Sequence, residues 1–67
     1  MSLERAFQTG LNLVRQAGLP AKGNDLPVLA AWRVFEKNAV SKQHDERFEV
    51  EAPLYAKKLI LMAFAGA

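Results

Sequence analysis

The sequence has no cysteine, a single histidine, three prolines and no long hydrophobic run. Without cysteine, a disulfide-stabilised scaffold and a thiolate zinc site are excluded. The longest uncharged apolar stretch covers residues 59–67, whereas a membrane-spanning helix needs about 20 residues. No basic segment followed by an apolar run marks a secretory signal near the N-terminus. We therefore expect a soluble, cytoplasmic protein without a membrane span.

The chain also lacks a large excess of charges of one sign. Nine Lys and Arg residues face seven Asp and Glu residues, for a net charge of +2, and only Lys57 and Lys58 are adjacent basic residues. Nucleic-acid-binding proteins usually carry a dense basic stripe, which is not evident here. Apolar residues make up 51% of the chain, and this fraction excludes an intrinsically disordered protein.

The chain is short but rich in large apolar side chains. Its 67 residues allow one domain, residues 1–67, and include 23 Val, Ile, Leu, Met, Phe, Trp and Tyr residues. A domain of this size buries only about 60% of the surface that its unfolded chain exposes. The surplus of large apolar side chains predicts a surface that a partner covers, most simply a second copy of the same chain.

Residues 3–17 have the pattern of an amphipathic helix. One stripe of about 140° holds the small and apolar residues, namely Leu3, Ala6, Phe7, Gly10, Leu11, Val14 and Ala17. Ser2 suits the N-cap and Gly18 suits the position after the last turn. Gly10 lies near the centre of the stripe, where it lets another helix approach closely. That helix belongs either to the same chain or, at a dimer seam, to a second copy.

Residues 25–40 predict a second helix with Asp25 at its N-cap and Pro27 in its first turn. Apolar residues occupy two of its faces, which is typical of a central helix packed from both sides. Glu36 falls within the apolar stripe. We interpret it as a residue at the rim of that stripe, because burying an unpaired carboxylate is costly.

Residues 41–52 form a polar connection, in which Phe48 to Glu51 alternate with the period of a strand. Four residues are too few for a sheet, so a one-turn helix or an extended arm is an equal alternative. Ala52-Pro53 indicates a boundary, because the residue before proline avoids helical backbone angles and proline favours the first turn. A third helix is therefore expected over residues 53–65, with a short strand over 59–64 as the alternative. This helix is apolar nearly all round, so it must dock against other surfaces.

Few residues offer chemistry. His44 lies in the most polar stretch and has no second ligand at a suitable spacing, so no metal or cofactor is predicted. No hydroxyl residue lies in a pattern typical of a nucleophile with its base. We expect a protein that is not an enzyme. An active site would need an oligomer seam, where Glu36 and Tyr55 would be the groups to test.

The sequence therefore predicts an all-α fold, a small three-helix bundle completed by oligomerisation. The hypothesis for its function is protein–protein interaction, as an adaptor, regulator, inhibitor or assembly subunit. A bacterial or phage accessory protein would belong to this class. Large apolar residues ringed by charge are typical of binding hot spots. The expected interface residues are Leu61, Met62 and Phe64, with Lys57 and Lys58 at the rim.

The alternative hypothesis is a small nucleic-acid-binding transcriptional regulator. The polar face of the first helix carries residue types that read bases, namely Arg5, Gln8, Asn12 and Arg15. Any solvated helix face carries the same types. A helix-turn-helix joins its two helices by a turn of about 3–4 residues. The connections between the expected helices are longer, which argues against this motif.

Overall fold

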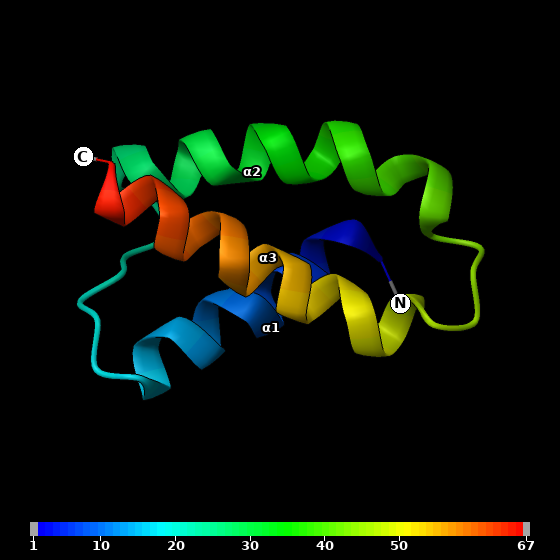
Figure 1. The fold of residues 1–67 in the computed structure, drawn as a ribbon, viewed down its shortest axis with the longest axis horizontal. Coiled ribbons are helices and arrows are strands. Elements are labelled where there is room, and N and C mark those ends of the chain that lie inside the picture. The colour runs from blue at the N-terminus through cyan, green and yellow to red at the C-terminus, as the bar shows by residue number, and fades with distance from the viewer. Residues whose placement is uncertain (1, 67) are drawn as a thin grey trace.

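The computed structural model describes residues 2–66, and over these residues the chain is all-α. Helix α1 spans Leu3–Gln16, α2 spans Leu26–Ala39 and α3 spans Phe48–Ala65, with a short 3₁₀ turn at Val40–Lys42. Helix α3 lies across both other helices (Figure 1), whereas α1 and α2 contact each other much less. The expectation that the second helix is central is therefore wrong, and α3 holds the bundle together.

Both ends of α1 are fixed as the sequence predicts. The Ser2 hydroxyl oxygen accepts a hydrogen bond from the Arg5 backbone N–H at 3.2 Å, which satisfies a donor of the first turn. Gly18 has a φ of +97°, a left-handed conformation that glycine adopts without strain. The N–H groups of Gly18 and Leu19 donate to the carbonyls of Arg15 and Val14. This double hydrogen bond is a Schellman motif, and it ends the helix.

Helix α2 begins at the predicted place, but Asp25 acts differently from the expected cap. Its side chain makes no capping bond to α2. Instead, its carboxylate accepts a hydrogen bond from the Lys22 backbone N–H at 3.1 Å, while the Asp25 N–H donates to the Lys22 carbonyl. Asp25 therefore closes the turn that precedes the helix.

Helix α3 begins at Phe48 rather than near Pro53, so Pro53 lies inside the helix. The polar connection is correspondingly shorter than residues 41–52. Phe48 and Ala52, one turn apart, are both buried, and so is Pro53. Packing of this extra turn outweighs the local preference against helix before proline.

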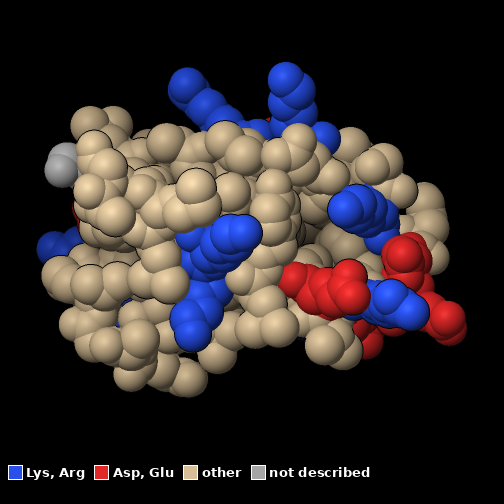
Figure 2. Space-filling view, in the orientation of Figure 1, with Lys and Arg blue, Asp and Glu red and all other residues tan. Residues whose placement is uncertain are grey.

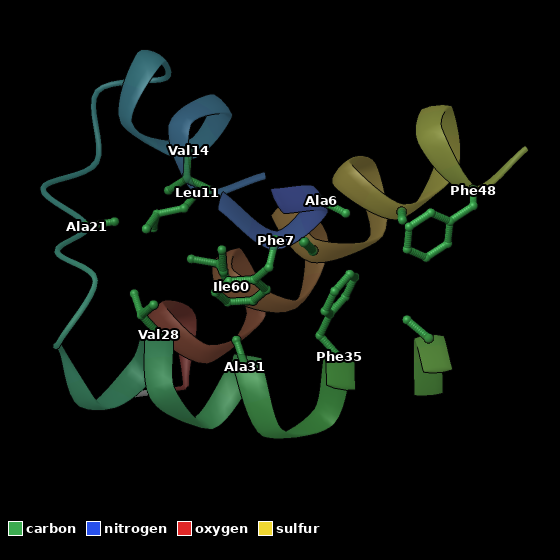
Figure 3. Packing of buried hydrophobic residues seen from close by; sticks show 13 residues of the cluster. Ala6, Phe7, Leu11, Val14, Ala21, Val28, Ala31, Phe35, Phe48 and Ile60 are labelled. Atoms are coloured by element: carbon green, nitrogen blue, oxygen red, sulfur yellow. The ribbon is translucent and has the colours of Figure 1, made fainter. Parts of the chain in front are cut away.

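The core joins all three helices through a row of aromatic rings. Phe7 meets Trp32 edge to face, with ring centroids 5.1 Å apart, and Phe35 lies 5.4 Å from Phe7. Phe35 also contacts the Tyr55 ring of α3 at 6.1 Å. Figure 3 shows Phe7, Phe35 and Ile60 converging from the three helices. Phe35 and Ile60 are fully buried, so these rings fix how the helices pack.

Gly10 sets the distance between α1 and α3. A Cβ atom at this position would lie 2.6 Å from the Pro53 carbonyl oxygen and 2.7 Å from the Ala56 Cβ. The close approach that the sequence predicts at Gly10 is confirmed, and the helix that approaches belongs to the same chain.

Candidate protein-interaction surface

The outward side of α3 carries an exposed apolar row. Val50 is 69% exposed, Leu54 55% and Met62 60%, and Leu61 is half-buried beside them. At 100° per residue these four side chains project within an arc of about 120°. Lys57 and Lys58 lie in the middle of the row. We call these six residues the α3 outer face.

The predicted interface residues divide between this face and the core. Met62 and Lys58 are exposed, whereas Leu61, Phe64 and Lys57 are half-buried. Leu61 and Phe64 pack partly against the core cluster. For this reason Met62 is a better candidate for partner contact than Phe64, although the predicted role of Phe64 stays a prediction.

Val50 and Leu54 belong to the same row and were missed by sequence reasoning. The expected helix start at Pro53 left Val50 in a polar connection and Leu54 in a first turn. Once the helix begins at Phe48, Val50, Leu54 and Leu61 fall at spacings of four and seven residues on one side. If the helix start had been placed correctly, the sequence would have shown these residues on one face of the helix.

Charge is unevenly distributed around the α3 outer face. Figure 2 shows the acidic side chains gathered, with basic ones among them, at the end where α3 begins, whereas the charged side chains over its middle are basic. Four of the seven acidic residues fall between positions 45 and 51, namely Asp45, Glu46, Glu49 and Glu51. The apolar row therefore runs from an acidic end to a basic middle.

Helix α2 also exposes apolar side chains on its outward side. Leu26 is 80% exposed and Val34 44%, and these residues alternate with the exposed Arg33 and Lys37. The second apolar face expected for this helix therefore exists, but no other helix within residues 2–66 covers it.

The polar face of α1 is occupied by contacts within the chain. The Gln8 amide donates to the Asn12 side-chain oxygen at 3.3 Å, and Arg15 donates to the same oxygen at 3.4 Å. Arg15 also donates through Nε to the Ala21 carbonyl at 2.7 Å, which ties α1 to the following turn. Three of the four candidate base-reading residues are thus hydrogen-bonded to one another. The fourth, Arg5, is exposed at the start of the helix.

The groups named for possible catalysis do not meet around one pocket. Tyr55 accepts a hydrogen bond from the Asn38 amide at 3.0 Å and borders a pocket of about 490 Å³ between α2 and α3. Glu36 is exposed and does not line this pocket. A second pocket of about 350 Å³ lies between α1 and α2, bordered mainly by apolar side chains that include Phe7, Leu29 and Trp32.

Residues 2–66 contain no preorganised polar centre. Within this range no polar or charged residue is buried, and no group of three His, Asp or Glu residues is placed to hold a metal ion. His44 is exposed in the connection before α3. None of the helices described is long and apolar enough to cross a bilayer.

No known protein family, curated protein or solved structure matches this chain.

Proposed function

We propose that this chain is a small non-enzymatic protein that acts through contact with another polypeptide chain, and that the α3 outer face is its contact surface. The roles that fit are adaptor, regulator, inhibitor or assembly subunit, and the bundle is completed by oligomerisation. The observation that carries the proposal is the exposed apolar row along α3, centred on Leu54 and Met62.

The free energy gained when a partner covers this apolar row supports the proposal. Complete burial of a Val, Leu or Met side chain contributes about 1.5–3 kcal/mol. Val50, Leu54 and Met62 are each more than half exposed, so covering them contributes several kcal/mol. Lys57 and Lys58 add charges within the same surface. Most of the binding energy of an interface comes from a few residues near its centre, and the residues around them exclude water.

Site-specific photocrosslinking tests the proposal. A photoreactive amino acid at position 62 is expected to form covalent adducts with a polypeptide in cells that express the protein, because Met62 is exposed within the α3 outer face. The same amino acid at Asn12, exposed on α1, is the matched control and is expected to give none. Adding Leu54→Asp to the position-62 chain is expected to remove the adduct.

Two results would contradict the proposal. One is the absence of any adduct at position 62. The other is equal labelling from positions 62 and 12, since this would show that α3 has no preference over a polar helix face.

A further inference from the structure

We propose that the partner on the α3 outer face is a second copy of this chain, bound with the two α3 helices antiparallel about a two-fold axis. This inference rests on the proposed function and identifies its partner. The order of charges along α3, the register of its apolar residues and the different charge pattern of α2 support this partner.

The charges of α3 are arranged in an order that complements itself. Glu51 lies toward the start of the helix, and Lys57 and Lys58 lie further along it. No carboxylate lies three or four residues from either lysine, the spacing at which helix neighbours pair. In an antiparallel pair, Glu51 of each copy faces Lys58 of the other. A parallel, in-register pair instead sets glutamate against glutamate and lysine against lysine.

The apolar residues fit the same arrangement. A two-fold axis that sets Val50 opposite Leu61 of the second copy passes between residues 55 and 56. One that sets Glu51 opposite Lys58 passes between residues 54 and 55. The two axes differ by one residue, so with Val50 opposite Leu61 the Glu51 of one copy and the Lys58 of the other are offset by two residues, about 3 Å along a helix, which a lysine side chain spans. Leu54 then lies near the axis, close to its own counterpart.

The outer face of α2 lacks this self-complementarity. Its exposed apolar side chains alternate with Arg33 and Lys37, and Glu36 is the one acidic residue of the helix. Glu36 lies three residues from Arg33, the spacing at which neighbours on one helix pair, so two copies joined through this face gain no charge pair that a single copy lacks. A second copy therefore fits α3 better than α2.

The dimer is expected to be modest in size and affinity. A standard interface covers about 800 Å² on each partner, a large share of the 4658 Å² surface of this protein. Helix α3 has 18 residues, a length of about 27 Å, and supplies most of the contact alone. Dissociation is thus expected at micromolar concentrations, and salt is expected to weaken the charge pairs.

Charge reversal tests both the partner and the orientation. Glu51→Lys and Lys58→Glu, each alone, set like charges against each other twice in a homodimer and are expected to weaken it about tenfold. Mixing the two variants, one of them isotopically labelled so that the three possible dimers differ in mass, creates a heterodimer with two opposite-charge pairs, and native mass spectrometry is expected to show it in excess over both homodimers. The double variant is expected to dimerise like the wild type. Glu36→Lys, an exposed charge reversal on α2, is the control and leaves dimerisation unchanged.

Two other outcomes would each contradict one part of the proposed dimer. A wild type that stays monomeric to 1 mM, a concentration about a thousandfold above the micromolar range, overturns the second copy as partner. Oligomerisation as part of the proposed function falls with it, and contact with a different polypeptide is then decided by the crosslinks at position 62. A dimer lost in Leu54→Asp but unaffected by the charge reversals keeps α3 as the contact and overturns the antiparallel arrangement.

Discussion

Gly10→Ala is expected to destabilise the fold by about 1–2 kcal/mol, although alanine is the better helix former. The new Cβ would lie 2.6 Å from the Pro53 carbonyl oxygen and 2.9 Å from the Lys57 backbone nitrogen. Because these are backbone atoms, α1 and α3 must move apart, and such overpacking typically costs 1–3 kcal/mol, occasionally more. The helix-propensity gain of about 1 kcal/mol offsets only part of this cost.

Thermal unfolding followed by circular dichroism, at one fixed protein concentration, measures the effect of Gly10→Ala. A loss of this size lowers the Tm of a domain this small by about 10 °C. Gly23→Ala is the matched control, because a Cβ atom at Gly23 meets nothing within 4 Å and the residue has no positive φ. An equal Tm in the Gly10→Ala variant and the wild type would show that α1 and α3 do not cross as closely as described.

Phe35→Ala is expected to cost about 3–5 kcal/mol, the usual loss for a fully buried phenylalanine. The Phe35 ring contacts Phe7, Trp32 and Tyr55, so its removal leaves a cavity where all three helices meet. A domain of this length has a total stability of about 3–10 kcal/mol. The variant is therefore expected to be largely unfolded at 25 °C or to unfold in very little denaturant.

Urea titration with Trp32 fluorescence and far-ultraviolet circular dichroism checks the Phe35→Ala result. Leu26→Ala is the control, because Leu26 is 80% exposed and a surface substitution usually changes stability by no more than about 0.5 kcal/mol. Equal urea midpoints for the two variants would contradict the central place of Phe35 in the core.

Much of this fold could be predicted from the sequence because it depends on interactions between residues that are close together in the chain. The Ser2 cap, the Gly18 stop and the apolar stripe of α1 each depend on contacts within one or two turns. The start of α3 was wrong because the rule for residues before proline is also local, whereas burial of Phe48 depends on contact with distant parts of the chain. A helical pattern likewise cannot show which helix is central, since this depends on how the helices cross.

The candidate surface was predicted only in part for the same reason. Met62, Lys57 and Lys58 were found because α3 is apolar nearly all round and must dock against something. Periodicity alone does not separate the side of such a helix that meets its own core from the side that meets a partner. Phe64 was therefore grouped with Met62, although it packs partly against the core, and Val50 was left outside the helix.

The mass of the protein in solution, measured by light scattering over a hundredfold concentration range, shows whether two copies of this chain associate through α3. The wild type is expected to approach the mass of two chains, against 7.4 kDa for one, as its concentration rises. Leu54→Asp is expected to stay a folded monomer with an unchanged circular dichroism spectrum, because Leu54 is exposed. A wild type that remains at one chain throughout, or a Leu54→Asp variant that dimerises as well as the wild type, would contradict self-association through α3.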